Sequence, residues 1–327
     1  MKRTFLAILL LAAATPWGGA VETASGKLST VIGEDAVSVT ELSLTGTMDA
    51  RDFKYISDSM PQLSVLDISG VTIEEYSDRE PLFANFTYYP AGELPKYSLM
   101  GKPLTSVSLP STLTSIGEAA FAGCAELTEI SLPSTVATIG NYAFSSASKL
   151  ADVKGGEGVR TIGDYAFSDW TTVREIVIPS TVEYIGDRAM RNWNSLAELT
   201  SNAVTPPELG DNVWENVDYE KVNLTVPAAG EMAYRLAEQW QDFFKSSSAK
   251  PLAAESLRVA VDGDVVTITS DEEISTVQLF DMSGILLQSA APHSQQFSLT
   301  LSGYSGRAYV VRCVSGGNEK IIKISRQ

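Results

Sequence analysis

The chain has 327 residues and carries 40 Asp and Glu against 24 Lys and Arg, a formal net charge of −16. Such acidity argues against binding to nucleic acid or to anionic membrane surfaces, because both are themselves negatively charged. Only two cysteines, Cys124 and Cys313, are present, so a small disulfide-stapled scaffold is excluded and folding must rest on apolar burial.

Residues 1–20 have the pattern of a secretory signal peptide. Two basic residues precede an apolar run from Phe5 to Ala14 that is too short to span a bilayer, and small residues follow it. We therefore expect export and a mature chain that starts near Val21. The expected location is extracellular or the outer cell surface, with the periplasm as the alternative. No later segment approaches eighteen apolar residues, so no membrane insertion is expected.

Residues 21–100 are expected to form an irregular N-terminal part of a repeat array. The segments Leu42-Ser43-Leu44 and Leu66-Asp67-Ile68 carry the same apolar pattern 24 residues apart, which is typical of two early coils. Between Ile73 and Lys102 the period is lost, which indicates one irregular coil with a long insertion.

Residues 101–248 contain a repeat of 23 residues. The dipeptide Ile-Gly recurs at positions 116, 139, 162 and 185 without slippage. Leucine-like residues at i, i+3 and i+5 recur with it, which predicts a leucine-rich α/β solenoid whose coils share one core. Each coil is expected to hold two short strands, a tight turn at the glycine, and a one-turn helix begun by Asn141 or its counterparts Asp164 and Asp187.

The same register decides the role of Cys124. Its counterparts at intervals of 23 residues are Ala147, Trp170 and Trp193, so the position is predicted to be a packing position and not that of a nucleophile. The array is expected to end in one helix over residues 231–244, whose apolar residues share a face and cap the open end of the core.

The repeats "LTEISLPSTVATIGNYAF" and "VREIVIPSTVEYIGDRAM" resemble those of BspA-type leucine-rich repeat proteins, which are surface and secreted proteins. The resemblance extends over roughly residues 27–245. It implies binding or adhesion, with no catalytic residues to carry over.

Residues 249–327 are predicted to form a separate small β-sandwich after the linker "SSSAKPLAAE". Asp262-Gly263, between two alternating segments, indicates a hairpin turn. The segments "LFDMSG" and "GRAYVVRC" resemble the C-terminal sorting domains of the type IX secretion route, although Ile285 stands where those domains often carry Arg or Lys. Seven Lys and Arg nearly balance eight Asp and Glu in this tail, so the negative charge is concentrated in residues 21–248.

The sequence does not indicate catalytic chemistry. The single histidine, His293, lies in the polar stretch "APHSQQ", and no nucleophile motif accompanies it. Two distant cysteines and one histidine cannot build a zinc site, and "GGEG" at 155–158 occupies the place of a Pro-Ser-Thr turn. We therefore expect no enzyme activity, no cofactor and no metal.

One acidic position recurs in four successive coils and is called the acidic ladder here; its members are Glu129, Asp152, Glu175 and Glu198. Each lies between inward-pointing residues of the first strand, so each is predicted to face solvent. Lys154 and Arg174 in neighbouring columns would relieve part of the repulsion. The ladder is either a solvated surface or a site for a cationic partner or a divalent ion. Hydrolysis would need one carboxylate buried in a cleft.

Tyr142, Tyr165 and Tyr184 lie near the coil turns, either partly buried along the solenoid edge or free to stack on sugar rings. The hypothesis for the whole chain is a secreted, non-enzymatic binding or adhesion protein that recognises an extracellular protein or a glycan through the solenoid face. The alternative is a glycan-binding component of a polysaccharide-capture system. The hypothesised binding residues are Glu129, Asp152, Glu175, Glu198, Lys154, Arg174 and Tyr184.

Overall fold

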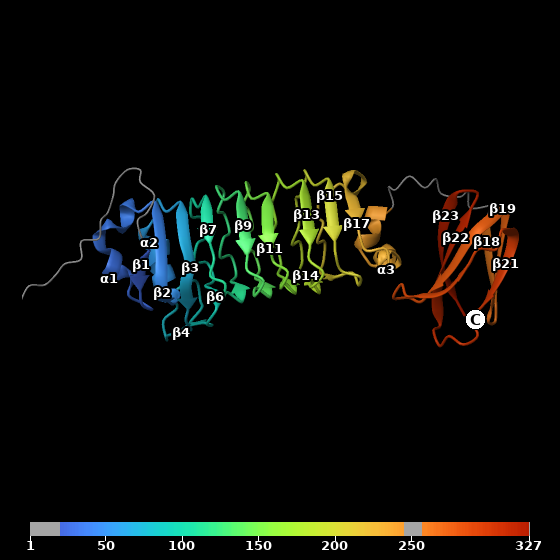
Figure 1. The fold of residues 1–327 in the computed structure, drawn as a ribbon, viewed down its shortest axis with the longest axis horizontal. Helices are drawn as coiled ribbons and strands as arrows, with labels where there is room; N and C mark the ends of the chain where they lie inside the picture. The colour runs from blue at the N-terminus through green and yellow to red at the C-terminus, as the bar shows by residue number, and fades with distance from the viewer. Residues whose placement is uncertain (1–19, 245–256, 327) are drawn as a thin grey trace, which may run out of the picture. The chain divides into compact units, whose positions relative to one another are not determined.

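The computed structural model describes residues 20–244 and 257–326 (Figure 1). They form two compact units, the first reaching Glu198 and including Pro207–Asp218, and the second taking Leu199–Pro206 and the chain from Tyr219 onward. Nearly all of the expected signal peptide, and the expected linker at 246–255, lie outside the described residues. The division of the chain at residues 100 and 248 stays a prediction.

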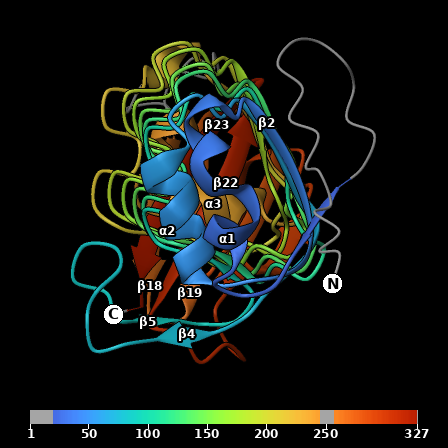
Figure 2. The same ribbon diagram turned by 90° about the vertical axis from the view of Figure 1, so that its left-hand side faces the viewer.

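The first unit begins with two irregular coils and a pair of short helices. Strands β1 (Val21–Thr23), β2 (Glu41–Met48), β3 (Val65–Ile73) and β7 (Ser106–Ser108) form a parallel sheet in that order. Leu42 lies opposite Leu66 in this sheet, which confirms the two early coils. Helices α1 (Leu28–Ile32) and α2 (Ala50–Ser59), with the 3-10 helix η1 (Gly33–Ser38), lie at the N-terminal end (Figure 2).

Buried polar groups hold α2 in place. The carboxylate of Asp52 is almost fully buried and accepts hydrogen bonds from the N–H groups of Gly26, Leu28 and Asp49 at 2.7–3.0 Å. At the C-terminal end of α2, Nζ of Lys102 donates one hydrogen bond to a carbonyl group within α2, at 2.7 Å, and one to the carbonyl group of the residue after α2, at 2.8 Å. These bonds satisfy backbone groups that a helix end leaves without partners. The expected insertion is the hairpin β4 (Tyr76–Ser77) and β5 (Tyr88–Tyr89).

The regular coils stack in register, as the 23-residue period predicts. Their second strands form a six-stranded parallel ladder of β6 (Glu93–Leu94), β8 (Ser115–Ile116), β10 (Thr138–Ile139), β12 (Thr161–Ile162), β14 (Tyr184–Ile185) and β16 (Glu208–Leu209). Ile139 lies directly between Ile116 and Ile162, and all three are buried. The first strands are β9 (Glu129–Leu132), β11 (Asp152–Gly155), β13 (Glu175–Ile178) and β15 (Glu198–Ser201).

The expected one-turn helix after each glycine is wrong. The segment that follows Gly140 forms turns, and Tyr142 and Ser146 have φ angles of 56° and 59°. The reason is that alternate N–H groups bond to the next coil, as Phe144 N–H does to the Ala166 carbonyl, so an i to i−4 ladder cannot form. Asn141 likewise accepts from the N–H of Asp164 in the next coil at 2.9 Å and does not cap a helix in its own coil.

Two further columns of side chains lie in the core beside the isoleucines. The rings of Phe121, Phe144 and Phe167 stack nearly parallel, with centroids 5.1 and 5.5 Å apart. Beside them, Trp170 and Trp193 stack at 6.0 Å, and the Sγ of Cys124 lies 3.2 Å from the Leu99 carbonyl oxygen. Cys124 is fully buried, as expected for a packing position, and burial raises its pKa to about 12, which keeps the thiol protonated.

The predicted helix over residues 231–244 is wrong in its extent. Helix α3 (Glu231–Leu236) ends where Ala237 becomes extended, and a separate 3-10 helix η3 (Trp240–Phe244) follows. The break lets the ring of Trp240 pack edge-on against Tyr234 at 5.1 Å, while the Tyr234 hydroxyl reaches the Ala203 carbonyl at 3.0 Å. The strand β17 (Asn223–Thr225) and the 3-10 helix η2 (Tyr219–Lys221) precede α3. A capping role for this segment stays a prediction.

The tail is all-β, as predicted. Its strands are β18 (Leu257–Asp262), β19 (Val265–Phe280), β20 (Leu286–Ala290), β21 (Ser294–Thr300), β22 (Ala308–Ser315) and β23 (Asn318–Ser325). The first half of β19 pairs with β18 and β21, and the second half pairs with β20 and β22. The two halves enclose a core that contains Val266, Ile268 and Leu279. Gly263 makes the expected hairpin turn with a φ of 56°.

Candidate functional site

The acidic ladder lies on the outward side of the first strands. Glu129, Asp152, Glu175 and Glu198 each begin a strand, and all four are exposed. Side chains alternate along a strand, so the burial of Ile130 and Leu132 forces Glu129 outward. Asp152 is paired with Glu129 across the β9–β11 ladder, which sets these two carboxylates side by side.

The ladder is neutralised unevenly. Nζ of Lys154 lies 2.6 Å from Glu129 and 3.6 Å from Asp152, and the hydrogen bond to Glu129 raises the pKa of Lys154. Within residues 20–244 and 257–326, no cation lies within 4.0 Å of Glu175. Arg174 is exposed next to Glu175, and its backbone carbonyl accepts hydrogen bonds from the N–H groups of Ala197 and Glu198. Among Glu129, Asp152 and Glu175, the charge is therefore least compensated at Glu175.

Tyr184 does not belong to this surface. It lies on β14 in the six-stranded ladder, between Thr161 and Glu208, whereas the acidic side chains lie on the first strands. Tyr184 therefore lies on a different sheet from the other hypothesised binding residues, because the turn after the first strand carries the chain onto another sheet before Tyr184 is reached.

The other two tyrosines stack on each other. The rings of Tyr142 and Tyr165 are 4.9 Å apart and nearly parallel, and the guanidinium of Arg188 covers the other side of Tyr165 at 5.9 Å. Tyr165 is therefore covered on both faces. Tyr142 is 42% exposed and is the member of this stack that could meet a ligand.

The sheet of first strands is interrupted between β11 and β13. β11 pairs with β9 only, and no backbone hydrogen bond joins β11 to β13, two strands that the structure describes in full. Most Cα pairs across this gap are more than 8 Å apart. We call the space between the two strands the β11–β13 slot.

Two changes in the repeat coincide with the β11–β13 slot. Gly155 stands where the previous coil has Leu132; its φ is 75°, a Cβ there would overlap the Leu132 carbonyl oxygen, and Gly156 N–H donates to that same oxygen. These contacts draw β11 towards β9. In the next coil the packing position changes from Ala147 to Trp170, whose buried indole lines the cavity beside the slot.

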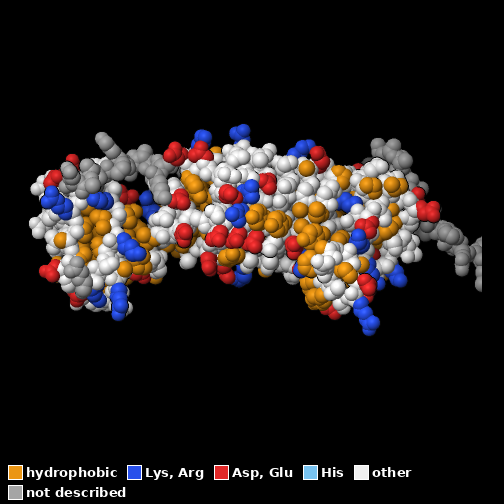
Figure 3. Space-filling model, turned by 180° about the vertical axis from the view of Figure 1, so that it is seen from behind, with side chains coloured by type: hydrophobic (Ala, Val, Ile, Leu, Met, Phe, Trp, Pro, Cys, Tyr) orange, Lys and Arg blue, Asp and Glu red, His pale blue; other side chains and the backbone are white. Residues whose placement is uncertain are grey.

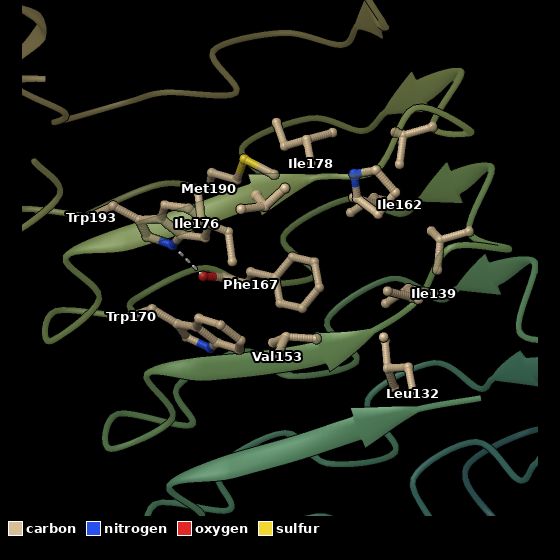
Figure 4. Close-up of a pocket in the computed structure, with 16 residues that line it drawn as sticks. Leu132, Ile139, Val153, Ile162, Phe167, Trp170, Ile176, Ile178, Met190 and Trp193 are labelled. Atoms are coloured by element: carbon tan, nitrogen blue, oxygen red, sulfur yellow. Dashed lines mark hydrogen bonds between the residues drawn. The ribbon is translucent and has the colours of Figure 1, made fainter. Parts of the chain in front are cut away.

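The slot opens onto a small apolar cavity of about 50 Å³. In Figure 4, Val153 from β11 and Ile176 from β13 lie on opposite sides of Phe167, with Trp170 beside Val153. Val153 and Ile176 are only partly buried, although their register counterpart Ile130 is buried. The sequence signal for this feature was "GGEG", which the pattern of repeats identified only as a turn.

A second, broader groove of about 560 Å³ separates β7 from β9, which are likewise unpaired. Half of its lining residues carry hydroxyl groups, among them Ser106, Ser108 and Ser131, and Glu129 is also part of the lining. Figure 3 shows that acidic side chains also gather over the middle of the solenoid on the face seen from behind, next to exposed hydrophobic side chains.

The remaining residues considered for chemistry lie apart. His293 is exposed between β20 and β21, with Nδ1 2.9 Å from Oε1 of Glu273. In the described ranges no three His, Cys, Asp or Glu side chains are grouped so as to hold a metal ion. No helix there is both long enough and apolar enough to cross a bilayer.

Comparison with known proteins supports the repeat assignment. Residues 92–220 match the family described as BspA type leucine-rich repeat region, in six copies. Among solved structures, the chain is similar to a leucine-rich repeat protein of T. pallidum, with 28% identity over 42% of this chain and 57% of that one and a TM-score of 0.34. It is also similar to a leucine-rich cell surface protein of Faecalibacterium prausnitzii, with 22% identity over 52% and 44% of the two chains and a TM-score of 0.35.

A third similar structure is the pneumococcal vaccine antigen PcpA, with 14% identity over 71% of this chain and 35% of that one and a TM-score of 0.30. The chain thus spans about half of the first two proteins that it matches. No match was found among curated proteins. The family match thus covers residues 92–220, and the stacked coils there form a leucine-rich repeat fold.

Proposed function

We propose that this protein is an exported, non-enzymatic binding protein that recognises an extracellular protein through the first-strand face of its solenoid. The observation that carries the proposal is the acidic ladder, four exposed carboxylates in consecutive coils on one rigid stack of strands. A stacked face presents many side chains at fixed spacing without needing to reorganise, which lowers the entropic cost of binding.

Charge would select the partner. Complementary potentials speed association and disfavour partners of like charge. Glu175, with no cation within 4.0 Å in the described part of the chain, is the member best able to meet a Lys or Arg of the partner, while Lys154 shields Glu129 and Asp152 in part. The exposure of all four carboxylates disfavours hydrolysis, because a catalytic acid needs burial that raises its pKa.

The test starts with a screen of the full chain without residues 1–20 against immobilised extracellular-matrix proteins. Asp152→Lys combined with Glu175→Lys should weaken binding to a cationic hit at least tenfold, with an unchanged circular dichroism spectrum. Glu34→Lys combined with Asp35→Lys makes the same charge change in η1, away from the ladder, and serves as the control. Equal binding by the ladder variant and the wild type would remove the ladder from the mechanism.

A glycan ligand is the second candidate function. The observation that favours it is the exposed ring of Tyr142, since sugars stack on aromatic faces. On a glycan array, Tyr142→Ala should abolish the hits while the ladder variant keeps them. Hits that persist in Tyr142→Ala would exclude this site for glycans.

Surface localisation through a type IX sorting role of the tail is part of the same proposal. Its support is the resemblance of "LFDMSG" and "GRAYVVRC" together with the all-β fold of residues 257–326. In a cell that carries this route, a chain that stops at residue 244 should be lost from the surface fraction. Surface recovery equal to that of the full chain would refute the sorting role.

A further inference from the structure

We infer that the β11–β13 slot is a docking site for an extended segment of the partner protein, which pairs as an added strand and inserts aliphatic side chains into the apolar cavity. This inference deepens the proposed function, since it names the part of the face that holds the partner and the kind of segment that fits.

The backbone is the first reason. β11 and β13, both fully described, present edges to each other with no hydrogen bond between them, and most Cα pairs across the slot exceed 8 Å. Neighbouring strands in a sheet lie about 4.8 Å apart, so the gap between β11 and β13 is wider than that between paired strands, as an added strand requires. Unpaired strand edges are templates for an added strand.

The apolar lining is the second reason. Side chains that occupy an inward position, Val153 and Ile176, remain partly exposed at the slot, and the outward Val177 is 49% exposed. Gly155 leaves out the side chain that Leu132 and Ile178 supply in the coils on either side. The inward side chains of an inserted strand would lie between those of β11 and β13, so they would fill the space that Gly155 leaves without a side chain.

The charges indicate which segment fits. Asp152 and Glu175 are register counterparts that face outward on the two sides of the slot. Lys154 leans towards Glu129 on β9, with Nζ 2.6 Å from that carboxylate. The outward position between Asp152 and Glu175 therefore favours a Lys or Arg of the added strand. A segment with a basic residue, an aliphatic residue, any residue and a second aliphatic residue matches four successive positions of the slot.

The experiment uses the full chain without residues 1–20 and a fluorescent probe peptide, Gly-Ser-Lys-Val-Thr-Leu-Thr-Ser-Gly. Anisotropy should show saturable binding of this peptide. Replacing its Val and Leu by Ser, or its Lys by Glu, should weaken binding at least tenfold. Amide hydrogen exchange should show new protection in residues 152–155 and 175–178, because the added strand supplies partners to both edges.

A variant pair tests the location. Val177→Asp places a charge at the rim and should weaken the probe at least tenfold, while Val37→Asp, at a position of similar exposure (58% against 49%), should leave binding unchanged. Absent binding, equal binding of the Ser-substituted peptide, or protection elsewhere in the chain would overturn the slot assignment. The exchange measurement on wild-type protein decides the question even if Val177→Asp were to unfold.

The result is separable from the proposed function. Suppose that the ladder variant no longer binds a cationic matrix protein, while the probe peptide gives no protection from hydrogen exchange at β11 and β13. The slot proposal is then refuted, and the proposed binding face is retained. If the probe binds in the slot while ladder reversal leaves every matrix protein bound, the ladder proposal fails.

Discussion

Truncating Phe144 should test whether the column of stacked rings holds the solenoid together. Phe144 is fully buried, and its ring lies between those of Phe121 and Phe167 at 5.1 and 5.5 Å, with the edge of Trp170 at 6.3 Å. Phe→Ala in a core costs about 3–5 kcal/mol, because the cavity collapses only in part. Each aromatic pair adds about 0.5–1.5 kcal/mol beyond its buried area. We therefore expect Phe144→Ala to lower the free energy of unfolding by about 4–5 kcal/mol, at the upper end of that first range.

Urea unfolding followed by tryptophan fluorescence measures this loss, because Trp170 and Trp193 lie in the same core as Phe144. Tyr142→Ala is the matched control, since it removes an aromatic ring two residues away that is 42% exposed and stacks on Tyr165. Its cost should stay near about 1 kcal/mol. In a solenoid the lost contacts weaken the interfaces between neighbouring coils, so the first unfolding transition should shift to lower urea.

The reasoning fails if Phe144→Ala and Tyr142→Ala destabilise the chain equally. It also fails if Phe144→Ala loses less than about 1.5 kcal/mol, well below the range for a buried aromatic side chain. Either result would mean that the coils adjust freely around the missing ring.

Two further predictions follow from the coil turns and the buried thiol. In Gly140→Ala the new Cβ would lie 2.8 Å from Glu118 N and 2.9 Å from the Ile116 carbonyl oxygen, so the melting temperature should fall. Such overpacking should lower the free energy of unfolding by about 1–3 kcal/mol. An unchanged melting temperature would contradict the stacking geometry. Burial raises the pKa of Cys124 to about 12, so its unfolded thiol ionises first and the free energy of unfolding should fall as the pH rises from about 9 towards 12. Cys124→Ala should show a shallower fall over that window in urea titrations, and identical slopes for the two proteins would argue against a protonated buried thiol.

The period of 23 residues was enough to predict the stacked columns. When every coil has the same length, equivalent residues return to the same place, and Ile116, Ile139 and Ile162 are in register for that reason. The packing role of Cys124 and the exposure of Glu129 followed from the same argument, because both depend only on which positions alternate or share a column.

Features that depend on contacts between coils were not predictable in the same way. Asn141 is of a residue type favoured at helix N-caps, but its side chain accepts a hydrogen bond from the N–H of Asp164 in the next coil, and no helix forms. The segment 231–244 has helical periodicity throughout, yet the packing of Trp240 on Tyr234 accompanies a break after Leu236. Local pattern cannot reveal such competing partners, because they come from distant parts of the chain.

By itself, the sequence determined the coil length, the identity of the core columns and the acidic face of the first strands, because a fixed period converts spacing into position. Only the tertiary structure decided where neighbouring coils separate. Gly155 and Gly156 lie close to the Leu132 carbonyl of β9, Trp170 lines the cavity beside the slot, and β11 and β13 are unpaired. Such contacts between coils arise only once the coils are stacked, so the sequence alone could not place the β11–β13 slot.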